Sequence, residues 1–149
     1  MIVPIILGSK TDKDHAQKIA DVLSEFSVKS DIIVASAHKV PEKVVEIVKK
    51  LNENTEPTVV ITVVGMSNGL GGVVAGSCVH PVISCPPFKD HEDYLVNVHS
   101  NLQMPSDVPV MTVLNYKNAA FAALRIFAQS DASLKKKLLQ RIESIKKEY

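Results

Sequence analysis

A histidine and a lysine, His38 and Lys39, stand side by side in residues 36–39 (SAHK), directly after a run rich in isoleucine and valine. An imidazole, with an unperturbed pKa of about 6.5, can accept and release a proton near neutral pH. An isolated histidine in a loop is more often simply exposed to solvent. His38 is nevertheless the leading acid–base candidate, because three other unusual segments recur at comparable places in the chain.

Residues 8–12 (GSKTD) follow the first apolar run of the chain. Glycine lets the backbone come close to a ligand, and the start of a helix presents free N–H groups to an anion, so a phosphate or a ribose would fit there. The alternative is purely structural, because serine, threonine and aspartate are common helix caps and glycine often ends a strand. The spacing matches neither a Walker loop nor a dinucleotide fingerprint, so ATP and NAD are not indicated.

Residues 65–72 (GMSNGLGG) contain four of the six glycines of the chain. They follow a run that is nearly all β-branched, and a stretch of small residues comes after them. Such a cluster indicates close approach of the backbone to a ligand. Tight packing of a helix against its neighbours is the structural alternative, and both interpretations can hold at the same loop.

Residues 84–87 (SCPP) are rigid, because two prolines fix their own φ angles and restrict the residue before each. Cys85 would be a nucleophile only with a base beside it, and none is adjacent in the local sequence. We therefore predict a buried core thiol without a catalytic role. The histidines and cysteines show no spacing typical of metal ligands, so no metal site is predicted, and residues 90–93 are interpreted as a polar loop.

Strand-like and helix-like runs alternate along the chain. The predicted strands are residues 2–7, 31–35, 58–64, 82–84 and 108–114, and the last two predicted helices are residues 119–128, with Asn118 as N-cap, and about 131–148. Alternation of this kind predicts a flavodoxin-like three-layer α/β/α sandwich with a parallel sheet of about five strands. Ligands of such sheets bind beyond the carboxyl ends of the strands, where all four segments fall.

Size and composition indicate one globular domain of 149 residues. The formal charge of +1 gives no broad surface for nucleic acid, and no apolar run is long enough for a membrane span. Two cysteines and no leader segment favour a cytoplasmic location. The basic face of the last helix is interpreted as a solvated surface, and its apolar stripe is expected to pack on a neighbouring subunit or domain.

In order and spacing, the four segments resemble the PurE family of phosphoribosylaminoimidazole carboxylases over nearly the whole chain. The chain is similar to the second class of that family, because Lys39 follows His38 and residues 67–70 read SNGL. Residues 103–106 (QMPS) and 118–120 (NAA) also look like family positions. Two positions depart from the family pattern: Met66 stands where arginine is usual, and Gly72 where proline is frequent.

The resemblance implies reversible addition of carbon dioxide to the imidazole carbon of 5-aminoimidazole ribonucleotide, which gives the 4-carboxy nucleotide of de novo purine biosynthesis. It implies no metal, ATP, biotin or other cofactor, and a homo-oligomer, an octamer in the family. His38 would move the ring proton, and Lys39 and Ser67 would help to place carbon dioxide. The implied substrate-binding residues are Gly8, Ser9, Asp12, Ser36, Gly65, Asn68, Gly69 and Gly71, of which Ser9, Asp12 and Ser36 would hold the ribose phosphate.

Two alternatives remain open at this point. The first is a mutase of the other class, which acts on the N-carboxylated isomer of the same nucleotide. The second is a non-catalytic protein that binds a phosphate ligand, because a fold does not fix a function.

Overall fold

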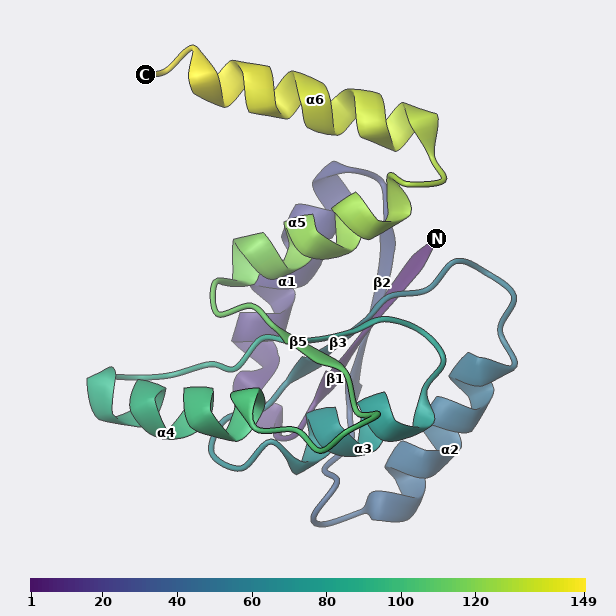
Figure 1. The fold of residues 1–149 in the computed structure, drawn as a ribbon, viewed down its shortest axis with the longest axis vertical. Helices are drawn as coiled ribbons and strands as arrows, with labels where there is room; N and C mark the ends of the chain where they lie inside the picture. The colour runs from purple at the N-terminus through teal and green to yellow at the C-terminus, as the bar shows by residue number, and fades with distance from the viewer.

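Strands and helices alternate along the computed structural model, which describes residues 1–149 (Figure 1). The strands are β1 (Ile2–Leu7), β2 (Lys29–Val34), β3 (Val60–Val63), β4 (Val82–Ser84) and β5 (Val110–Thr112). The helices are η1 (Lys10–Asp12), a short 3-10 turn, α1 (Lys13–Glu25), α2 (Pro41–Asn52), α3 (Gly69–Ser77), α4 (His91–Leu102), α5 (Tyr116–Phe127) and α6 (Ala132–Lys146).

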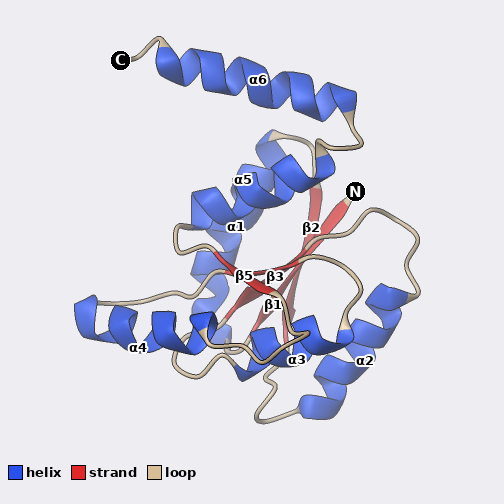
Figure 2. Cartoon of the chain, viewed as in Figure 1, coloured by secondary structure: helices blue, strands red, loops and turns tan.

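The five strands form one sheet in the order β2-β1-β3-β4-β5, and every neighbouring pair is parallel (Figure 2). Helices cover both faces, α1 and α5 on one side and α2 and α3 on the other (Figure 1). The predicted flavodoxin-like sandwich is therefore confirmed. The strand order reverses between β1 and β3, which is where open parallel sheets leave a crevice for a ligand.

The central strands are apolar on both faces, because each face is covered by helices. In β1, Ile5 and Leu7 belong to the larger core, which α1 and α5 complete, whereas Ile6 belongs to the smaller core under α2 and α3. The same alternation separates Ile61 from Val60 in β3. The runs of isoleucine and valine thus form a sheet that is buried on both faces.

Two local predictions are wrong. Asn115, not Asn118, caps α5, since its Oδ1 accepts from the N–H groups of Lys117 and Asn118 at 2.9 and 3.2 Å. The polar residues 90–93 do not form a loop but begin α4, where the carboxylate of Asp90 accepts from the N–H of Asp93 at 2.9 Å. Aspartate is a strong N-cap because its side chain accepts from free N–H groups of the first turn, so Asp90 begins a helix here.

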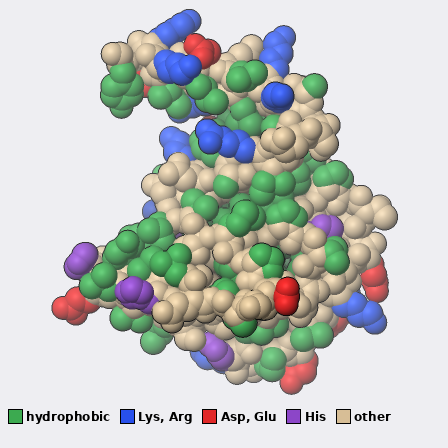
Figure 3. Space-filling view, viewed as in Figure 1, with side chains coloured by type: hydrophobic (Ala, Val, Ile, Leu, Met, Phe, Trp, Pro, Cys, Tyr) green, Lys and Arg blue, Asp and Glu red, His purple; other side chains and the backbone are tan.

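The last helix, α6, extends beyond α5 and away from the sheet (Figure 1). Leu134 and Leu138 are buried, whereas Leu139 and Ile145 are exposed. A cavity of about 500 Å³ lies between α5 and α6. Figure 3 shows lysine and arginine side chains gathered at this end of the molecule. None of the helices is both long and apolar enough to span a membrane.

Candidate active site

The strand register brings the ends of neighbouring strands to one edge of the sheet. Leu7, the last residue of β1, lies opposite Val34 of β2 and Val63 of β3. Thr62 of β3 lies opposite Ser84, the last residue of β4. The four segments singled out in the sequence therefore begin side by side along this edge, which we call the rim.

Backbone hydrogen bonds continue past the strand ends and hold the first residues of the rim. The N–H of Gly8 donates to the carbonyl oxygen of Val63 at 3.0 Å, and the N–H of Ala35 donates to that of Leu7 at 2.9 Å. Gly8 has no room for a side chain, because a Cβ there would lie 2.7 Å from Cγ2 of Val64. The segments after β1, β2 and β3 are thus in direct contact.

The imidazole of His38 lies against the glycine-rich segment. A Cβ added to Gly69 would lie 2.6 Å from Nε2 of His38, so the ring rests on the bare backbone at the first residue of α3. His38 itself is exposed on its other side. The structure therefore places the acid–base candidate against Gly69, which follows Ser67 and Asn68 in the chain.

Ser36 and Lys39 share the tight turn that carries His38. The Oγ of Ser36 accepts from the N–H of Lys39 at 3.4 Å, and the Ser36 carbonyl oxygen accepts from the N–H of Val40 at 2.9 Å. Lys39 is exposed, so its ammonium group is free to reach over the rim.

Ser9 and Asp12 lie in the turn after β1. Ser9 Oγ accepts from the hydroxyl of Thr11 at 2.8 Å and from its N–H at 3.3 Å. Burial raises the pKa of the Asp12 carboxyl, and this effect outweighs the lowering by the Thr11 hydroxyl and by the charge of Lys89.

Asn68 is the centre of the glycine-rich segment. Its side chain is buried; Oδ1 accepts from the N–H of Gly71 at 2.9 Å, and Nδ2 donates to Oδ1 of Asn101 at 2.7 Å. A Cβ at Gly71 would lie 2.6 Å from the Asn68 side chain, so glycine is required there. The sequence analysis placed Asn68 among the ligand-binding residues, and the structure shows its side chain turned inward.

The sequence analysis missed three polar residues of α4 that contact the rim: Asn97, Ser100 and Asn101. Asn97 and Asn101 are buried, and they stand four residues apart on one face of the helix. The spacing of four residues between two asparagines was the feature of the sequence that could have indicated a polar helix face here. An inner face built from amides shows no apolar stripe, which is why the pattern analysis did not recognise a helix here.

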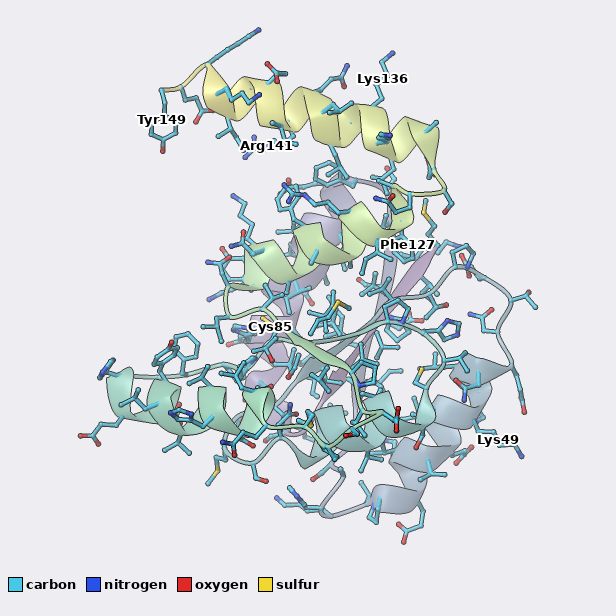
Figure 4. All side chains as sticks on the ribbon, viewed as in Figure 1. Lys49, Cys85, Phe127, Lys136, Arg141 and Tyr149 are labelled. Atoms are coloured by element: carbon cyan, nitrogen blue, oxygen red, sulfur yellow. The ribbon has the colours of Figure 1, made fainter.

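Cys85 is a buried core thiol, as predicted (Figure 4). No base is adjacent to Cys85 in the local sequence, but in the folded chain Nε2 of His15 lies 3.4 Å from its Sγ. Burial raises the pKa of Cys85 to about 12. Burial, and then the charge of Lys18, lowers the pKa of His15, so both groups are neutral at pH 7.

We expect a thiol reagent at pH 8 to modify Cys78 and to leave Cys85 unreacted until the protein unfolds. Cys78 is half-buried, and burial raises its pKa less strongly, whereas the buried Cys85 has almost no thiolate at that pH. Counting modified thiols by mass spectrometry with and without denaturant checks this. Modification of native Cys85 at the rate of Cys78 would contradict it.

The two departures from the family pattern differ in their surroundings. Met66 is 74% exposed and has a positive φ of 60°. At Gly72 a Cβ would meet only Sδ of Met104 at 3.6 Å, an ordinary contact, so a larger residue fits.

No three histidine, cysteine, aspartate or glutamate side chains come together as a metal site would require.

Comparison with known proteins gives one consistent result. A family model described as AIR carboxylase matches residues 2–148. The chain is 42% identical over 144 residues to a phosphoribosylaminoimidazole carboxylase of Archaeoglobus fulgidus, covering 97% of this chain and 78% of that one. It is 40% identical over 148 residues to an N5-carboxyaminoimidazole ribonucleotide mutase of Methanocaldococcus jannaschii, covering 98% and 91%. The crystal structure of Treponema denticola PurE superposes with a TM-score of 0.92 at 36% identity, covering 99% and 92%.

Proposed function

This chain belongs to the AIR carboxylase family of purine biosynthesis, and on that premise we propose that it adds carbon dioxide reversibly to the imidazole carbon of 5-aminoimidazole ribonucleotide. The product would be the 4-carboxy nucleotide. The observation that carries the proposal is the contact between His38 and Gly69, because it joins a group that can move a proton to the segment that contains Ser67.

The proposed reaction uses the substrate's own amino-imidazole ring as the nucleophile. The ring carbon attacks carbon dioxide, and the new bond leaves that carbon tetrahedral, with its hydrogen and the new carboxylate both attached. His38 takes the hydrogen as a proton, and the electrons of the C–H bond restore the aromatic ring. The Lys39 cation stabilises the carboxylate, and holding carbon dioxide near Ser67 lowers the entropic part of the barrier.

The remaining rim residues are proposed to bind the nucleotide. Ser9, Asp12 and Ser36 carry polar groups in the turns that follow the paired strands β1 and β2, and we propose that they bind the ribose phosphate. The binding set also contains residues of the two glycine-bearing turns: Gly8, Gly65, Asn68, Gly69 and Gly71. Asn68 would act through the shape of its turn, because its side chain faces the protein.

An assay with two substrates tests the reaction. Purified protein receives either 5-aminoimidazole ribonucleotide with bicarbonate or the N-carboxylated isomer, and ultraviolet absorbance follows the 4-carboxy product. Turnover of the first substrate is expected. Turnover of the N-carboxylated isomer alone would instead establish the mutase, an alternative favoured by the name of the Methanocaldococcus jannaschii relative. Binding without turnover of either would indicate a phosphate-ligand binding protein.

We also propose that the chain assembles into a homo-oligomer, an octamer by its resemblance. Several large apolar side chains are exposed in the monomer, among them Val79, Leu95, Val96 and Leu102. Contacts between copies would cover such residues. Light scattering should give a mass near eight copies of the 16.2 kDa chain, and a monomer would contradict the proposal.

Replacing Lys39 by alanine is expected to raise the KM for bicarbonate about tenfold or more, since a charge-assisted contact contributes about 1.5–3 kcal/mol. The dissociation constant of the nucleotide should change little, because the ribose phosphate is held elsewhere on the rim. Lys49→Ala is the matched control, because Lys49 is exposed near the far end of α2 (Figure 4). Equal losses in both constants would argue against this role of Lys39.

A further inference from the structure

Polar side chains of α4 hold the glycine-rich segment on both sides of Ser67. Oδ1 of Asn97 accepts from the N–H of Met66 at 2.5 Å, and Oγ of Ser100 accepts from the N–H of Asn68 at 2.6 Å. Ser67 itself is exposed. The backbone is therefore fixed immediately before and immediately after the one residue of this turn that faces outward with a hydroxyl group.

The same helix face also holds the segment after β4. Nδ2 of Asn97 donates to the carbonyl oxygen of Pro87 at 2.9 Å, and the hydroxyl of Ser84 donates to Oδ1 of Asn101. Asn97 and Asn101 are each only 1% exposed. Buried amides whose partners are all fixed strongly favour one arrangement, because each lost partner leaves a buried polar group unsatisfied.

The held turn includes an unfavourable backbone conformation. Met66 has a φ of 60°, in the left-handed region that residues other than glycine rarely occupy. Such a conformation persists where surrounding contacts determine it, and it occurs often at functional sites. The Met66 N–H is held in this conformation by its hydrogen bond to Asn97. Without that bond, the turn is free to relax and to move Ser67.

We infer that Asn97 and Ser100 are positioning residues that hold Ser67 where carbon dioxide is bound. They act through the backbone of Met66 and Asn68. The inference rests on the proposed carboxylation, in which Ser67 helps to place carbon dioxide. The glycine-rich segment also contributes to the proposed nucleotide site, but the ribose phosphate is assigned to the turns after β1 and β2, which make no hydrogen bond to α4. A loosened segment should therefore affect carbon dioxide use more than nucleotide binding.

Ser100→Ala is the principal test, because it removes only the hydroxyl group that accepts from the Asn68 N–H. We expect kcat/KM for bicarbonate to fall about tenfold, the effect of one lost hydrogen bond, and the nucleotide dissociation constant to rise much less, by about threefold at most. Ser100→Thr keeps the hydroxyl and should recover most of the loss. His99→Gln, at an exposed polar position next to Ser100 on the same helix, is the control and should behave as the unaltered protein.

Amide hydrogen exchange gives a second measurement that needs no turnover. Exchange of the Asn68 N–H should quicken in Ser100→Ala, that of the Met66 N–H in Asn97→Ala, and neither in His99→Gln. If the unaltered protein does not carboxylate, the proposed function fails. Hydrogen exchange still tests whether Asn97 and Ser100 hold the glycine-rich segment. Unchanged exchange, an unchanged kcat/KM for bicarbonate, or an equal loss of nucleotide binding would each overturn the inference.

Discussion

The His38→Asn variant is expected to lose nearly all carboxylation, with kcat lowered by about 10²–10⁴-fold, while its affinity for the nucleotide stays within about threefold. Asparagine keeps a similar size and hydrogen-bonding capacity but cannot take up a proton. The side chain lies over Gly69 rather than in a core, so the fold should survive the change. Product formation by ultraviolet absorbance and nucleotide binding by calorimetry measure the two effects separately.

His91→Asn is the matched control for this variant. His91 is exposed at the start of α4, where it stacks on Tyr94, and it has no part in the proposed reaction. It should retain full activity. Undiminished turnover in His38→Asn would refute the proton-transfer role, and loss of nucleotide binding in step with turnover would reduce His38 to a binding residue.

Gly69→Ala is expected to lower carboxylation by about 10–100-fold with little change in stability. The new Cβ would lie 2.6 Å from Nε2 and 2.9 Å from Cε1 of His38, so the ring must move. Because His38 is an exposed side chain, it can turn away without disturbing the core, and alanine suits a helix better than glycine. A displacement of about 1 Å of a catalytic group is enough for a loss of this size.

Gly76→Ala provides the control within the same helix. A Cβ there would lie 3.6 Å from Cγ2 of Val108, an ordinary contact, so activity should be unchanged. Combining Gly69→Ala with His38→Asn should cause no loss beyond that of His38→Asn, since both changes act on one side chain. Full activity of Gly69→Ala, or losses that multiply in the double variant, would show that the contact with His38 does not matter.

The sheet was predictable because its strands are marked by strong local signals. Residues 2–7 and 82–84 form strands with the predicted bounds, since apolar runs closed by polar or turn residues leave few alternatives. Strand-end reasoning also predicted that the four segments begin along one edge of the sheet, as they do, because parallel strands deliver their carboxyl ends to one edge. The ends of the last strand were predicted less well, because residues 108–114 were expected to be extended and β5 covers only Val110–Thr112.

Features that depend on tertiary packing escaped prediction. The contact of His15 with Cys85 spans 70 residues of sequence, and no local pattern records it. Helix α4 was missed because its inner face carries Asn97 and Asn101, which bury amides rather than aliphatic groups. In both places the polar partners lie on different elements, so the signal exists only once the chain has folded.

The attachment of two rim segments to α4 has a practical consequence for hybrids with related enzymes. Because Asn97 bonds to both Met66 and Pro87, the glycine-rich segment, the segment after β4 and α4 are matched to one another. Transplanting the glycine-rich loop alone would pair it with a foreign helix. Chimeras with crossover points before β3 and after α4 should therefore remain well folded where shorter grafts do not.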